Sequence, residues 1–213
     1  MSGGAGVGRI IGTPACVAEG AAHLAACEPR FAAALALTGP LPLRRRADGF
    51  EPLLSAIVSQ QVSVASADAI WRRLQEAGLT GAHRIAQAGD EDLRACGRPP
   101  EDPLCARAGP GGHRLAALRD APTEAVVARL VEVPGIGRWT AEIYAMFSLG
   151  RADVFAPADL ALQEAARVLF EMEARPRERE FREMAEAWAP WRAVAARLLW
   201  AYYRVAKERE GIR

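Results

Sequence analysis

Asp159 is the residue of this sequence whose type and position are most suggestive of chemistry. It follows Phe155-Ala-Pro157-Ala and precedes an apolar-patterned segment at 160–171. Proline pushes the residue before it towards extended geometry, so we expect 155–157 to be non-helical and a helix to begin just after Asp159. The commonest role of an Asp in that position is a simple N-cap. The helix dipole also favours a negative charge there, which could stabilise a positive charge on a bound sugar.

A sharp turn between two expected helices lies upstream, at Pro134-Gly-Ile-Gly137. Proline stops the first helix, and the two glycines leave main-chain N–H groups uncovered at the start of the second, where an anion can bind. This is the form of a helix-hairpin-helix, which holds a DNA phosphate without reading sequence. An ordinary helix–helix turn is the alternative, but the following Arg138-Trp-Thr-Ala141 favours DNA binding.

Further motifs occur in order around these two. They are Gly49-Phe50, Ser55-Ala-Ile-Val-Ser-Gln-Gln-Val-Ser63, Asp153-Val-Phe155, Pro157-Ala-Asp-Leu-Ala-Leu162 and Trp188-Ala-Pro-Trp-Arg192. The set resembles the helix-hairpin-helix DNA glycosylase superfamily, in its 3-methyladenine DNA glycosylase II branch, over about 7–97 and 115–205. The resemblance implies a base-excision enzyme that flips an alkylated purine, 3-methyladenine or 7-methylguanine, out of double-stranded DNA. It would hydrolyse the N-glycosidic bond with help from Asp159 and leave an abasic site.

The resemblance also implies roles for individual residues. Trp139 and Trp200 match aromatic residues of the base pocket, with Tyr144 and Tyr202 as weaker candidates. A cationic base gains about 0.5–2 kcal/mol over an indole face. DNA contacts would fall on Gly135, Ile136, Gly137, Arg138, Thr140, Gln60, Gln61 and Ser63. The alternatives are plain helix surface for the two glutamines and core packing for the tryptophans; we favour the core for Trp71, Trp188 and Trp191.

Trp139 also bears on the type of reaction. Lyase members of the superfamily carry at this position a lysine that attacks the sugar as an amine. The only lysine of this chain is Lys207, so we expect a monofunctional hydrolase.

No cofactor is expected. The three histidines are scattered, and the four cysteines form no Cys-x-x-Cys and end at Cys105. Relatives that resemble endonuclease III carry instead a C-terminal four-cysteine cluster for iron–sulfur. The family implies at most a monovalent cation on the main-chain carbonyls of the hairpin, with no side-chain metal site.

Residues 97–114 depart from the family pattern, because they hold four prolines and four glycines where the family has a helix. The abrupt change and recovery suggest a local shift of reading frame, which would remove core contacts and leave every site residue untouched. It keeps open a non-catalytic or inactivated DNA-binding protein as the alternative function. A glycosylase for another lesion, such as uracil or hypoxanthine, is the other alternative.

The helical spacing of apolar residues predicts an all-α protein. The family resemblance implies a two-lobed glycosylase fold with a cleft between the lobes. We expect one domain, 1–213, with one lobe from 1–48 plus 160–213 and the other from 49–159, which includes the hairpin 130–141. Helices are expected at 16–37, 50–64, 66–77, 123–133, 138–149, 160–171, 177–187 and 190–209.

The net charge of +1 is not that of a general polyanion binder, so phosphate contacts must be local. The only basic triplet is Arg44-Arg-Arg46, for which a solvated loop is the alternative. The sequence shows no apolar run that could cross a bilayer and no signal peptide. We therefore expect no membrane partner and a location in a bacterial cytoplasm, associated in use with the nucleoid. We also expect a monomer.

Overall fold

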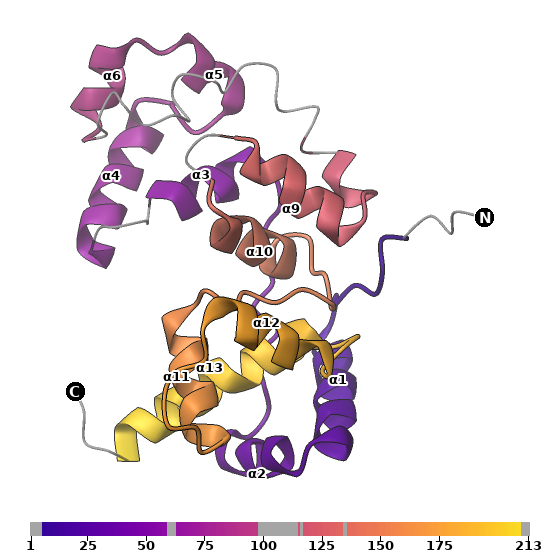
Figure 1. Cartoon of the computed structure of the whole chain (residues 1–213). Helices are drawn as coiled ribbons and strands as arrows, with labels where there is room; N and C mark the ends of the chain where they lie inside the picture. The colour runs from indigo at the N-terminus through magenta and orange to yellow at the C-terminus, as the bar shows by residue number, and fades with distance from the viewer. Residues whose placement is uncertain (1–5, 59–62, 98–114, 116, 134–135, 210–213) are drawn as a thin grey trace. The chain divides into compact units, whose positions relative to one another are not determined.

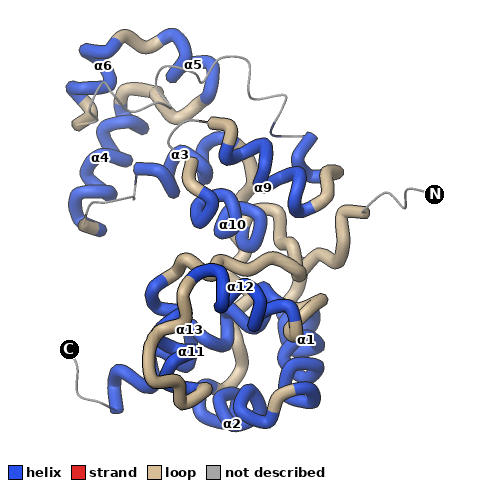
Figure 2. Tube along the Cα trace, in the orientation of Figure 1, coloured by secondary structure: helices blue, strands red, loops and turns tan. Residues whose placement is uncertain are grey.

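The computed structural model describes residues 6–58, 63–97, 115, 117–133 and 136–209. Its regular elements are the helices α1 (Pro14–Cys27), α2 (Pro29–Thr38), α3 (Phe50–Val58), α4 (Val64–Glu76), α5 (Ala82–Gln87), α6 (Asp90–Ala95), α9 (Thr123–Val131), α10 (Arg138–Phe147), α11 (Leu160–Leu169), α12 (Glu178–Glu186) and α13 (Arg192–Arg209), with a 3₁₀ turn at Ala117–Arg119. Loops join them (Figure 2), and the β-type pairing in the described part of the chain is one isolated bridge between Ile10 and Arg151. The predicted all-α class is confirmed.

The chain forms two compact units. One comprises the described residues of 1–7 and 46–144, and the other 8–45 and 145–213. The sequence-based lobes change instead at 48/49 and 159/160, so 145–159 falls in the other unit here. The hydrogen bonds of this segment explain the difference: Gly150 O accepts from Ile11 N at 2.7 Å, and Ala152 N donates to Arg9 O at 2.9 Å.

In the second unit, α13 packs beside α1, α2 and α11 (Figure 1). An aromatic cluster completes this core, in which Trp188 contacts the rings of Phe31, Phe155 and Phe181 edge-on. Trp188 and Trp191 are buried, which confirms the core role predicted for both.

The first unit has a core between its short helices and α3 and α4. Leu54 of α3 and Leu74 of α4 pack there with Ile85 and Leu93. These last two come from α5 and α6, which the sequence analysis did not predict. Trp71 packs against the same cluster, again as predicted.

The predicted segment 16–37 is two helices, α1 and α2. Glu28 has extended geometry, with φ −139° and ψ 109°, because Pro29 follows it. The Glu28 carboxylate then caps α2 by accepting from Arg30 N at 3.0 Å. A smaller difference is the end of α10, which stops at Phe147 and not at the expected residue 149. Residues 98–114 of the atypical segment lie outside the described residues.

Replacing Gly20 by Ala should destabilise the protein, because this glycine of α1 packs directly against Trp191 and Val194. A Cβ there would lie 2.6 Å from Trp191 Cε3 and 2.7 Å from Val194 Cγ2. Such overpacking costs about 1–3 kcal/mol, more than the roughly 1 kcal/mol by which helix propensity favours Ala. Thermal unfolding should show a lower Tm for Gly20→Ala and little change for Gly12→Ala, whose Cβ would meet nothing within 4 Å. An unchanged Tm for Gly20→Ala would contradict this packing.

Candidate active site

Asp159 lies at the N-terminus of α11, where its carboxylate oxygen Oδ1 accepts three N–H bonds. The main-chain amides of Ala161 and Leu162 each donate at 3.0 Å. The indole Nε1 of Trp200, in α13, donates at 3.2 Å. The backbone of Asp159 is extended, with φ −72° and ψ 117°, as is usual for an N-cap residue. The N-cap role is therefore confirmed, and the catalytic role stays a prediction.

The Trp200 ring packs against a second aromatic ring, that of Phe147. It is half-buried, and its centroid lies 5.7 Å from that of Phe147 at an interplanar angle of 32°. The structure thus brings together two of the residues that sequence analysis assigned to the site, Asp159 and Trp200. The hydrogen bond between them was not predicted.

The segment that leads to Asp159 is bound to the same helix as Trp200. Asp153 accepts two hydrogen bonds from the Arg192 guanidinium, at 2.6 and 2.9 Å. Beside them, Ala193 N donates to Ala152 O at 2.9 Å. Asp153 therefore has a structural role in positioning this segment.

The hairpin of the first unit is described on both sides of its tip. The helices are α9 and α10, and Ile136 is buried between their ends, with its main-chain N–H donating to Val133 O at 3.0 Å. Gly137 is exposed, and a Cβ on it would meet nothing within 4 Å. Its carbonyl accepts from Ala141 N at 3.1 Å, in the first turn of α10. The predicted phosphate site includes Gly135, which lies outside the described residues.

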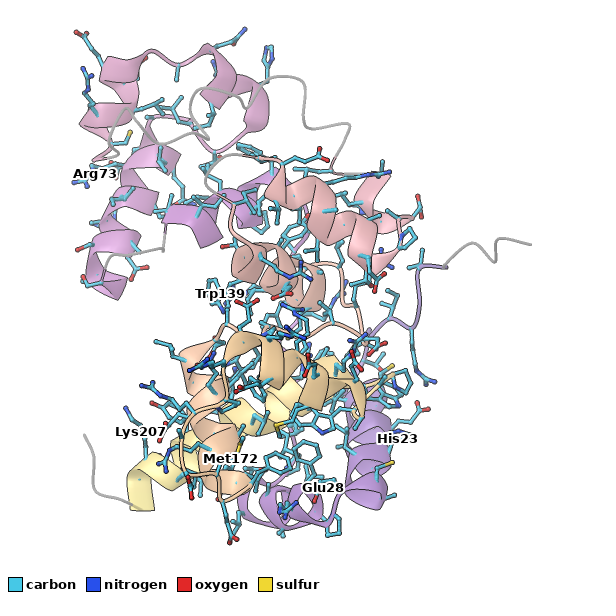
Figure 3. All side chains as sticks on the ribbon, in the orientation of Figure 1. His23, Glu28, Arg73, Trp139, Met172 and Lys207 are labelled. Atoms are coloured by element: carbon cyan, nitrogen blue, oxygen red, sulfur yellow. The ribbon has the colours of Figure 1, made fainter. Side chains whose placement is uncertain are left out.

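The residues that follow the hairpin differ in exposure. Trp139 projects from the first turn of α10 (Figure 3) and is 39 % exposed, which is unusual for a large aromatic residue. Thr140 is buried, so a DNA contact through its side chain would require movement. Arg138 Nε donates to the buried Glu142 carboxylate at 3.0 Å, so part of its charge is already balanced.

The remaining predicted site residues have these positions. Tyr144 is buried and its hydroxyl accepts from Gly49 N at 2.9 Å; burial raises the pKa of this phenol. Tyr202 is half-buried on α13. Ser63 caps α4, since its Oγ accepts from Ser66 N at 3.2 Å. Gln60 and Gln61 lie outside the described residues, and all of these assigned roles stay predictions.

The described side chains form no cluster suited to a metal ion. Across the described residues, no group of three or more His, Cys, Asp or Glu could hold one. No described helix is both long and apolar enough to span a membrane. These side chains offer a carboxylate in a fixed position that accepts a hydrogen bond from the indole N–H of an aromatic ring.

Comparison with known proteins agrees with these features. The profile of a family described as HhH-GPD superfamily base excision DNA repair protein matches residues 54–190. The chain is 28 % identical to DNA-3-methyladenine glycosylase 1 of Schizosaccharomyces pombe over 204 residues, 90 % of each protein.

Solved structures give the same result. A DNA-3-methyladenine glycosidase from Bacillus halodurans superimposes with a TM-score of 0.77 at 29 % identity, covering 94 % of both chains. The S. pombe 3-methyladenine DNA glycosylase in complex with abasic DNA has a TM-score of 0.72 at 28 % identity, over 85 % of this chain and 95 % of that one. Because the family profile covers well over half of the sequence, the predicted membership is confirmed and this chain belongs to the HhH-GPD superfamily of base excision DNA repair proteins.

Proposed function

We propose that this protein is a monofunctional DNA glycosylase that releases alkylated purines, such as 3-methyladenine and 7-methylguanine, from double-stranded DNA. The observation that carries the proposal is the Asp159 carboxylate, fixed at the start of α11 by the indole N–H of Trp200. The names of its relatives, DNA-3-methyladenine glycosylases, support the same activity. The protein acts as a monomer.

The chemistry follows from the substrate. A purine alkylated at N3 or N7 is cationic, so its glycosidic bond breaks with little acid catalysis. The enzyme must flip the nucleotide out of the stack, at a cost of a few kcal/mol, and stabilise the positive sugar that forms. The negative charge of Asp159 stabilises that positive sugar or activates the attacking water. Trp200 orients this carboxylate and presents a π face that favours a cationic base.

The position of the only lysine favours hydrolysis without a lyase step. Trp139 stands at the position that carries the attacking lysine in lyases of this superfamily. The single lysine of the chain, Lys207, is in the last turns of α13, with its ammonium 5.3 Å from the centroid of the Tyr203 ring. Product analysis should therefore show intact abasic sites rather than cleaved strands.

The test is release of methylated bases from duplex DNA by the purified protein. Chromatography identifies the released base, and alkali treatment counts the abasic sites in the same sample. Release of 3-methyladenine or 7-methylguanine with equal numbers of alkali-labile sites supports the proposal. Binding to DNA without release of any base would identify a DNA-binding protein that has no glycosylase activity.

Replacing Gly137 by Asp should weaken binding to duplex DNA of every sequence to a similar extent. The new carboxylate would face the phosphate that the hairpin amides hold, and the salt dependence of the affinity should become shallower. Gly137→Ala is the matched control, since its Cβ has open space around it. Fluorescence anisotropy with several duplexes at three salt concentrations measures both quantities. A weakening confined to some sequences would contradict main-chain phosphate binding.

A further inference from the structure

The exposed side chains of Arg44 and Arg45 belong to a loop that the second unit holds from two sides. Arg45 lies over Gly150, which leaves space for its guanidinium. A Cβ on Gly150 would stand only 1.8 Å from Arg45 Nη1, and the φ of Gly150, +73°, also suits glycine. Gly150, in the segment that follows α10, therefore allows Arg45 to take this position.

Arg197 of α13 holds the same loop from beneath. Its side chain is 1 % exposed, and its Nε and Nη2 donate to Leu43 O at 3.3 and 3.2 Å. Its Nη1 donates to Ala193 O at 2.7 Å, and the guanidinium lies 4.8 Å from the centroid of the Phe147 ring. The carbonyl directly before Arg44 is thus fixed by two N–H bonds.

Arg44 itself has a φ of +50°, a left-handed conformation that few non-glycine residues adopt. Such conformations cost free energy, persist when surrounding contacts enforce them and gather at functional sites. Here the contacts of Arg197 with Leu43 and of Arg45 with Gly150 flank the strained residue on both sides. These contacts fix the loop on both sides of Arg44.

The electrostatics of this arrangement favour an anion. Burial, together with the nearby charges of Arg44 and Arg45, lowers the pKa of Arg197 to about 10, so it is still a cation at neutral pH. The charges of Arg44 and Arg45 therefore lie near enough to Arg197 to repel it, and the acceptors that Arg197 uses are neutral carbonyls. A bound anion would offset this repulsion.

We propose that Arg44 and Arg45 form a second phosphate-binding site, which holds a phosphodiester of the DNA substrate through their guanidinium groups. The inference rests on the proposed function, because it takes DNA as the ligand. Guanidinium groups suit phosphate oxygens because they donate two parallel N–H bonds. For a chain with a net charge of only +1, such local sites must supply the sequence-independent part of the affinity.

The test is the salt dependence of affinity for an undamaged duplex, measured with the full chain. The double variant Arg44→Gln/Arg45→Gln should bind about three- to thirtyfold more weakly at low salt. The slope of log K against log salt should become shallower by about one for each phosphate that the variant no longer neutralises. Arg44→Lys/Arg45→Lys keeps the charge and should retain most of the slope.

The matched control is Arg179→Gln/Arg182→Gln, which removes the same charge from α12 of the same unit. Both arginines form ion pairs one turn away, with Glu183 and Glu178. This control should bind DNA like the wild type. Equal binding by the two Gln variants would overturn the site, whether both bind like the wild type or both bind more weakly, since a shared weakening would show an effect of net charge alone.

The experiment also separates this inference from the proposed function. If the wild type releases alkylated bases and the Arg44/Arg45 variant binds like the control, only the second phosphate site fails. If the wild type binds DNA but releases no base, the glycosylase proposal fails and the affinity comparison still tests the site. Circular dichroism of each variant checks folding, and should the Gln pair unfold, Arg45→Gln alone gives the same comparison against Arg179→Gln.

Discussion

Replacing Asp159 by Asn should reduce single-turnover base release by about two to three orders of magnitude, the cost typical of removing one electrostatic group from a transition state. Asn is as good an N-cap as Asp, and its amide oxygen can still accept from Ala161, Leu162 and Trp200. The change therefore removes the negative charge and keeps the geometry. Tm and affinity for an undamaged duplex should stay close to those of the wild type.

Asp153→Asn is the contrasting variant, because Asp153 forms a bidentate pair with Arg192. Removing that charge should lower the Tm more than Asp159→Asn does, while base release per folded molecule should fall less. Thermal unfolding compares the Tm values of the two variants, and single-turnover release on methylated duplex compares their base release. Comparable turnover by the wild type and Asp159→Asn would remove Asp159 from the chemistry.

Prolines and helical spacing were sufficient to predict most helix positions. Pro157 correctly predicts that Asp159 lies at the start of α11, and Pro134 and the glycines predict the start of α10 at Arg138. Pro29 restricts Glu28, so the sequence also contains a signal for the break between α1 and α2. The continuous apolar spacing of 16–37 predicted a single helix there instead. Local sterics act within a few residues, so a single sequence reports them well.

The contacts that shape the site act over longer distances in the sequence. Trp200 lies 41 residues from Asp159, and helical periodicity says which residues of α13 share a face but not what the face meets. The same holds for the pair between Arg192 and Asp153, 39 residues apart. The short helices α5 and α6 offer too few turns for a periodic signal, and contacts of Ile85 and Leu93 with the core stabilise them.

Replacing Trp200 by Phe and by Leu should separate the two roles of this side chain. Trp200→Phe keeps a π face but removes the N–H that donates to Asp159 Oδ1. A hydrogen bond to a charged group contributes about 1.5–3 kcal/mol, so release should fall roughly ten- to 150-fold, equally for cationic and neutral bases. Trp200→Leu removes the π face as well, which should cost cationic bases a further two- to thirtyfold at about 0.5–2 kcal/mol.

A double-mutant cycle with Asp159→Asn tests the link between the two residues directly. If Trp200 acts by orienting the Asp159 carboxylate, Trp200→Phe should slow release little or not at all once that carboxylate is gone, and the two effects will not add. Single-turnover release of 3-methyladenine, which is cationic, and of hypoxanthine, which is neutral, gives all four corners for both kinds of base. Additive effects would show that Trp200 acts independently of Asp159. Equal slowing for both bases in Trp200→Leu and Trp200→Phe would show that its ring plays no part in selecting charge, so that its contribution comes from the N–H bond and from packing on Phe147.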